Sequence, residues 1–115
     1  MINDFEEFRN GHLVRTAEVW KRLCELGANE ETKLDFDFTF TAFDKRSANA
    51  LKDVLKDYPI TISKEGILKP KYTISGNSGA IEWTEEQLLK WVDYLLSVGS
   101  DVGCEFDGCG ANAPK

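Results

Sequence analysis

The stretch from Leu34 to Thr41, with the sequence LDFDFTFT, alternates apolar and polar residues at every position. Successive side chains of a β-strand point to opposite faces, so this alternation predicts one buried face and one solvated face. The buried face carries three phenylalanines, Phe36, Phe38 and Phe40. Side chains of this size need a covering layer, which we expect the rest of the chain to supply.

Length and composition indicate a single folded domain over residues 1–115. With 42% hydrophobic residues, the chain is large enough to bury a core without metal ions or disulfides. The N-terminal segment is acidic and lacks a continuous apolar run, which argues against a signal peptide or a membrane span. The three cysteines are odd in number and lack paired CxxC spacing, so we expect reduced thiols, no zinc site and a cytoplasmic location.

The net charge of −6 is concentrated in the last third of the chain. Residues 1–81 hold 13 acids and 12 bases, whereas residues 82–115 hold seven acids and only Lys90 and Lys115 as bases. Such a field repels phosphate backbones, so we expect no direct binding of nucleic acid. The same field attracts basic partners.

Caps, breaks and apolar spacing predict seven elements. Thr84 and Gln87 have the spacing of a capping box, and the stretch 76–79, GNSG, is expected to be a flexible turn because it lacks the Lys-Ser/Thr of a phosphate-binding loop. The expected elements are a helix from Asn3 or Asp4 to Gly27 that Gly11 is able to interrupt, a strand at 34–41, a helix at 44–57, strands at 60–63 and 67–75, a helix at 84–99 and a strand at 101–106.

The last six elements spell βαββαβ, which is the order of the ferredoxin-like fold. We therefore predict an α+β sandwich with an extra N-terminal helix over residues 1–27, a βαββαβ core over residues 33–110 and an antiparallel sheet of order 4-1-3-2. This order places the phenylalanine-bearing strand inside the sheet, beside the last strand and the strand at 67–75, which accounts for its aromatic content.

No side-chain pattern indicates a catalytic, cofactor or metal site. Asp35 and Asp37 are compatible with an acid/base pair or a hard cation, but we favour cross-strand charge pairing with Lys69 and Lys71. His12 has no obvious acid or nucleophile as partner and is expected on the surface. The outward positions of the predicted sheet carry no aromatic residues, which argues against a stacking platform for RNA.

The segment 106–110, FDGCG, lies where the last predicted strand ends. Its glycines permit a tight exit, and Asp107 is able to accept hydrogen bonds from the backbone of such a turn. Alternatively, glycine-rich backbone beside an acid suits close approach by a partner. Cys109, between two glycines, is open to exposure and reactivity.

Several of these features resemble one family, the regulators of ribonuclease E activity of B type (RraB-like). They are the Leu26-Gly27 end of the first helix, the phenylalanine-bearing strand, the βαββαβ order and the ending from Phe106 to Gly110. The resemblance implies a ferredoxin-like fold, no enzymatic activity and a role in binding ribonuclease E and restraining RNA cleavage. It also implies that Phe106, Asp107, Gly108 and Gly110 are signature positions, whereas Cys109 stands where the family usually has tryptophan.

Two other functions stay open at this stage. A small acidic domain without catalytic groups also fits an immunity protein that neutralises a co-encoded, basic toxin of nuclease type. An enzyme would need polar groups converging in one pocket, around Cys109 or Asp35, and one histidine with scattered acids does not assemble such a pocket. For both binding functions we expect no cofactor and no membrane contact, with an undetermined oligomeric state and candidate partner-binding residues Glu105, Phe106, Asp107, Gly108 and Gly110.

Overall fold

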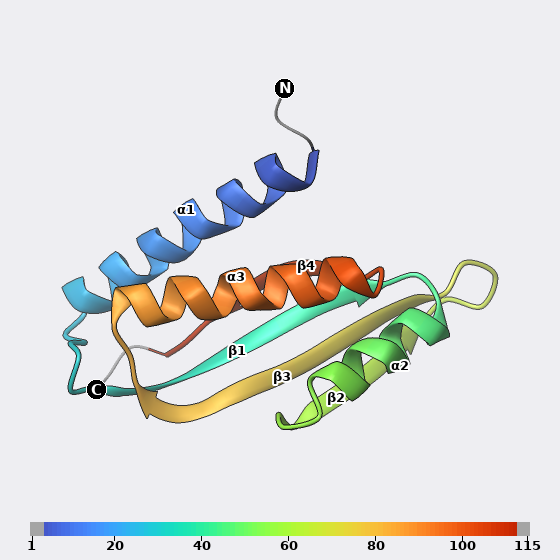
Figure 1. Ribbon diagram of the computed structural model, residues 1–115. Coiled ribbons are helices and arrows are strands. Elements are labelled where there is room, and N and C mark those ends of the chain that lie inside the picture. The colour runs from blue at the N-terminus through green and yellow to red at the C-terminus, as the bar shows by residue number, and fades with distance from the viewer. Residues whose placement is uncertain (1–3, 113–115) are drawn as a thin grey trace.

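The computed structural model describes residues 4–112 as a four-stranded antiparallel sheet with three helices (Figure 1). The strands lie in the order β2-β3-β1-β4, which is the predicted order 4-1-3-2 read from the opposite edge. The arrangement is compatible with the ferredoxin-like fold, to which α1 adds the extra N-terminal helix. The elements are α1 (Asp4–Glu25), β1 (Lys33–Ala42), α2 (Lys45–Val54), β2 (Ile60–Glu65), β3 (Lys71–Glu82), α3 (Glu85–Asp101) and β4 (Glu105–Gly110).

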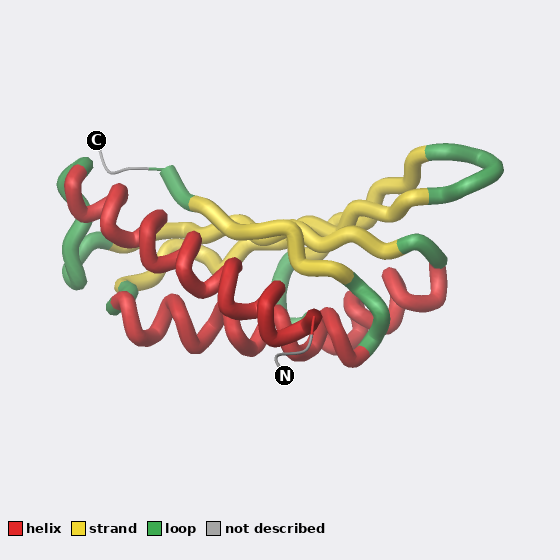
Figure 2. The backbone as a smooth tube through the Cα atoms, turned by 90° about the horizontal axis from the view of Figure 1, so that it is seen from above, coloured by secondary structure: helices red, strands yellow, loops and turns green. Residues whose placement is uncertain are grey.

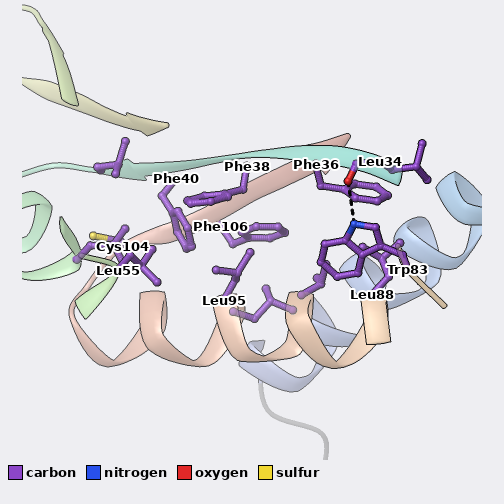
Figure 3. Close-up of a cluster of buried hydrophobic side chains, with 14 of the residues drawn as sticks. Leu34, Phe36, Phe38, Phe40, Leu55, Trp83, Leu88, Leu95, Cys104 and Phe106 are labelled. Carbon is purple, nitrogen blue, oxygen red and sulfur yellow. Dashed lines mark hydrogen bonds between the residues drawn. The ribbon is translucent and has the colours of Figure 1, made fainter. Parts of the chain in front are cut away.

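The core lies between the sheet and the helices, and β1 supplies its centre because it pairs with β3 on one side and β4 on the other. Trp83 packs at one end of the buried side chains of β1, and its indole N–H donates to the carbonyl oxygen of Leu34 at 3.0 Å. The alternation predicted for β1 is confirmed (Figure 3). The inward residues are each at most 3% exposed, and they are Leu34, Phe36, Phe38 and Phe40.

Helix α1 runs through Gly11 without a break, although the sequence permits an interruption there. A glycine inside a helix costs only about 1 kcal/mol relative to alanine, and packing of α1 against α3 offsets this cost. An ion pair between Arg9 of α1 and Asp93 of α3 joins the two helices. Of the two expected N-caps, Asp4 is the first helical residue and Asn3 lies outside the described residues.

The buried stripe of α1 differs from the predicted one. The apolar spacing of this segment indicates a stripe of Leu13, Ala17, Trp20 and Cys24, with Leu23 beside them, but Cys24 is exposed. Because α1 packs against both α3 and β4, its inward face is rotated by about one residue. The residues it buries are His12, Thr16, Trp20 and Leu23.

The stretch 76–79 is part of β3, so its prediction as a loop is wrong. A β-bulge explains the difference. Asp35 pairs with Ala80 and Asp37 pairs with Asn77, so β3 has one more residue than β1 between these two pairs. The last glycine of the stretch has a positive φ of 83°, and the hydroxyl of Ser78 accepts from the Phe36 N–H at 3.0 Å. Turn-forming residues are thus held within a continuous strand.

Several predicted boundaries also move. The predicted strand at 67–75 begins only at Lys71, and residues 66–70 form the tip of a hairpin that projects beyond the helices (Figures 1 and 2). Helix α2 ends at Val54, and α3 continues to Asp101, so β4 starts later than expected. The predicted capping box is confirmed, with both hydrogen bonds between Thr84 and Gln87 at 3.1 Å.

Candidate functional site

All three helices lie on one side of the sheet, and no described helix covers the other side (Figure 2). We call this uncovered side the open face. Its side chains are those that alternate with the core residues along each strand. They are exposed or half-buried at every predicted outward position, and none is aromatic: Asp35, Asp37, Thr39, Thr61, Ser63, Lys71 and Thr73.

Four carboxylates of β1 and β4 have no lysine or arginine opposite them in the described strand pairs of the open face. Elsewhere on this face charges are matched, because Lys33 lies opposite Glu82 and Lys71 lies opposite Glu65. The expected pairing of Lys69 and Lys71 with the β1 aspartates is therefore wrong, since the strand register carries these lysines away from them. The unmatched carboxylates form the acidic patch: Asp35, Asp37, Glu105 and Asp107.

A second bulge places Asp107. Thr39 pairs with Gly108 and Phe40 pairs with Phe106, so Asp107 is an extra residue on β4 between these two pairs. The next residue, Gly108, has a φ of 147°, which favours glycine. Asp107 was expected to accept from turn backbone, but its carboxylate accepts from the Thr41 hydroxyl at 2.6 Å. This contact fixes the carboxylate beside the open face.

Asp35 has a structural contact at the other bulge. Its carboxylate accepts from the side-chain amide of Asn77 at 3.1 and 3.2 Å and from the Gly79 N–H at 3.0 Å. These bonds stabilise the bulged turn of β3. Asp35 therefore adds charge to the acidic patch, while its position is set by the fold.

A shallow hollow of about 300 Å³ lies within the acidic patch, between Asp37, Thr39, Asp107 and the Gly108–Gly110 segment. Its floor is glycine backbone. A Cβ atom added at Gly108 would meet no atom within 4 Å, and one added at Gly110 would meet only the Asp37 Oδ1 atom at 3.9 Å. Two carboxylates beside an uncrowded floor suit the guanidinium or ammonium group of a partner.

The structure brings most of the predicted partner-binding residues together. Glu105, Asp107, Gly108 and Gly110 lie along the open face of β4. Asp37, which was predicted only to be solvated, joins them because it lies opposite Gly110. The alternation of β1 places Asp37 on the open face, but no sequence signal specifies the register that sets it beside β4.

Phe106 differs from the other predicted site residues because it points into the core. It is 2% exposed, and its ring packs edge-on against Phe40 and His12, with centroid separations of 5.2 and 5.0 Å. A partner on the open face does not touch it. Its role in the ending EFDGCG is to anchor β4 beneath the acidic patch.

His12 lies under β4 on the covered side. It is 6% exposed, with Phe8 stacked edge-on against it at 4.6 Å, so the expected surface position is wrong. Burial lowers the pKa of His12, and the charge of Arg15 lowers it further, while Asp107 and the Phe106 backbone oppose the shift. The imidazole is therefore neutral at neutral pH and acts as a packed core residue.

The thiols near the site are weak nucleophiles. Cys109 is half-buried and Cys104 is buried, and this burial raises the pKa of each thiol to about 11. Since the thiolate is the reactive form, neither side chain is activated at neutral pH. Within residues 4–112, no group of three or more histidine, cysteine, aspartate or glutamate residues is arranged to hold a metal ion.

Among the described helices, none has both the length and the apolar character needed to cross a bilayer. A comparison of the chain with protein-family models finds no match, and a comparison with curated proteins finds none either. The acidic patch and its hollow are therefore the features from which a function is inferred.

Proposed function

We propose that this protein is a non-enzymatic regulator that uses the acidic patch to hold a basic protein partner and restrain its activity. The observation that carries this proposal is the group of unmatched carboxylates around a glycine-floored hollow on an uncovered sheet face. Clustered charge of one sign speeds association with a partner of opposite sign and disfavours partners of like sign.

The hollow supplies the anchoring contact in this proposal. An arginine of the partner enters between Asp37 and Asp107, where a planar guanidinium is able to donate to carboxylate oxygens in pairs. Gly108 and Gly110 allow the partner to approach the backbone closely. Glu105 adds charge at the start of the same strand, where it strengthens attraction at longer range.

A nuclease is the class of partner that fits best, because surfaces that bind nucleic acid are basic. Carboxylates spread over the open face would occupy such a surface in place of phosphates. The resemblance of the Phe106–Gly110 ending to RraB-like proteins supports a ferredoxin-like regulator of a ribonuclease E-type enzyme. The second candidate is an immunity protein for a basic, nuclease-type toxin, and the acidity of the open face supports it equally.

The test is affinity capture from native lysate with three baits, followed by mass spectrometry at low and moderate salt. The patch variant is D37N/E105Q/D107N, and the control variant, E7Q/D53N/D57N, makes the same charge change at exposed positions outside the strands. We expect wild type and control to retain the same basic nuclease and the patch variant to lose it. The purified partner should also lose nuclease activity on addition of wild type.

The identity of the retained protein separates the two candidates. A ribonuclease E-type enzyme would support the first, and one small toxin domain would support the second. Equal retention by the patch variant, or capture of acidic proteins alone, would refute the proposed surface.

A second variant tests the hollow without changing charge. Gly110→Leu places an aliphatic side chain in the hollow, where a Cβ atom has room, so the fold should be unaffected. We expect affinity for the captured partner to fall by about tenfold or more, as for loss of a central anchor. Thr61→Leu adds the same side chain at an exposed position of β2, outside the acidic patch, and serves as control. Unchanged affinity of Gly110→Leu would show that the hollow is not the anchor.

A further inference from the structure

The β2–β3 hairpin ends in two exposed aliphatic side chains. β1 ends at Ala42, opposite Tyr72, so the hairpin beyond this pair projects past its neighbouring strand (Figures 1 and 2). Ile67 and Leu68, at the tip, are 94% and 95% exposed, whereas the other exposed large hydrophobic residues range from 37% to 67%. Single exposed apolar residues are ordinary, but an adjacent pair at the end of a projecting hairpin indicates a docking element.

The tip has a defined shape and a basic character. Gly66 has a φ of 84°, and a Cβ atom there would lie 2.9 Å from the Lys69 carbonyl oxygen, so the turn requires glycine. Lys64, Lys69 and Lys71 flank the aliphatic pair, and Glu65 is the single acid among residues 64–71. The tip is thus apolar and locally positive on a chain whose net charge is −6.

A groove of about 480 Å³ at the same end of the molecule has the complementary character. It lies between the first turns of α1, the residue after β1 and the start of β4, and none of the lysines and arginines within residues 4–112 lines it. Phe43 is 67% exposed at its mouth. Apolar side chains form most of its wall, chiefly Phe5, Phe8, Phe43 and Leu96. Two acids, Asp4 and Glu105, add negative charge.

We propose that the hairpin tip of one copy docks into this groove of a second copy, forming a reciprocal dimer. The aliphatic pair at the tip matches the phenylalanine-lined groove, and the flanking lysines match its acids. Within one copy the hairpin lies on the side of β1 away from β4, so it projects away from its own groove. Since tip and groove lie at the same end, a two-fold axis there lets each copy give one tip and receive one.

This dimer does not depend on the proposed nuclease partner. The hollow and Gly110 lie on the open face, whereas the groove lies between α1 and the start of β4, and the two have no described lining residue in common. Glu105 of the acidic patch lines the groove but not the hollow. The dimer is tested with the purified chain alone, so failure of one proposal leaves the other intact.

The test is sedimentation velocity of the full chain over a concentration series, with the 13.0 kDa monomer as reference. We expect wild type to move towards twice this mass as concentration rises. The tip variant I67S/L68S should raise the dimer Kd by at least about a hundredfold, because it removes four aliphatic anchors per dimer. The groove variant Phe43→Ser should raise it by at least about tenfold. All the substituted side chains are more than half exposed, so each variant should fold normally.

Two controls make the result specific. V14S/V54S removes exposed aliphatic groups elsewhere on the surface and should dimerise like wild type. A mixture of tip and groove variants should form more dimer than the tip variant alone, because a mixed pair retains one intact tip-and-groove contact.

Three outcomes would overturn the proposal. A groove variant that dimerises like wild type would mean that the tips pack against each other. Wild type that stays monomeric at every concentration would exclude the dimer. If that monomer also cosediments with phosphatidylserine-containing vesicles and the tip variant does not, the tip binds a lipid surface instead.

Discussion

The two faces of β1 belong to the same strand but have different physical roles. Phe36, Phe38 and Phe40 are wholly buried against helices and neighbouring strands, whereas Asp37, which alternates with them, is exposed on the open face. Burial of large aromatic side chains drives folding, so the covered face tolerates little change. The open face contributes little to packing, and its charges are therefore available for recognition.

The largest expected difference between the faces is in stability. Phe38→Ala should lower the free energy of unfolding by about 3–5 kcal/mol, because a buried aromatic side chain leaves a cavity. Asp37→Ala, one residue away on the open face, should change it by less than about 0.5 kcal/mol. Urea denaturation of both variants measures the contrast, and similar losses would show that the open face also stabilises the fold.

Thiol reactivity gives a second measure of the same contrast. In a Cys24→Ser background, Cys109 should react with a disulfide reagent about a hundredfold more slowly than an exposed thiol, because burial raises its pKa to about 11. A thiol introduced on the open face by Thr39→Cys supplies the fast reference. Denatured protein should show all thiols reacting at similar rates, and rapid labelling of native Cys109 would contradict the described packing.

Two glycines on opposite faces sharpen the comparison further. A Cβ atom at Gly76 would lie 2.5 Å from the Phe38 ring and 2.9 Å from the Pro59 carbonyl oxygen. Gly76→Ala should therefore cost about 1–3 kcal/mol of stability through overpacking. Gly110→Ala, where the added atom has room, should cost less than about 0.5 kcal/mol. Thermal and urea unfolding decide the matter, and equal costs would mean that Gly110 is also crowded.

The smallest expected effect is a pH dependence from His12. Burial lowers the pKa of His12 in the folded state below the ordinary value of 6.5. As pH falls below 6.5, the unfolded chain binds a proton that the folded chain does not, so the free energy of unfolding decreases. The decrease stops once pH passes below the folded pKa.

Urea titrations of wild type and His12→Gln between neutral and mildly acidic pH isolate this contribution. The difference in stability between the two proteins should change across this range as the unfolded histidine becomes protonated. Asp93, whose pKa is lowered by Arg9, and Glu86, whose pKa is lowered by Lys90, titrate in a more acidic range. Parallel pH profiles of the two proteins would contradict a buried neutral imidazole.

The covered face was largely predictable from sequence because its signals are local. The alternation in β1 identifies the buried phenylalanines, and the spacing of Thr84 and Gln87 identifies the start of α3. The order of the elements followed from these periodicities and caps. Such signals operate over a few residues and do not depend on which segments meet in space.

The acidic patch was predictable only in part, because it depends on register. Two bulges shift the pairing of β1 with its neighbours, and the one in β4 sets Asp37 opposite Gly110. The glycine-rich stretch 76–79 resembles a turn in sequence, but pairing with β1 holds it in β3. His12 shows the same limitation, since the face that α1 buries is set by α3 and β4.

The strand order also has a consequence during synthesis of the chain. β1 is translated before both of its partners, β3 and β4, and β4 is the last of the described elements to be made. Until β4 leaves the ribosome, one edge of β1 and one side of its phenylalanine row lack their native cover. The sheet is therefore completed only after β4 has emerged, and truncation before Phe106 should yield nascent chains that bind chaperones.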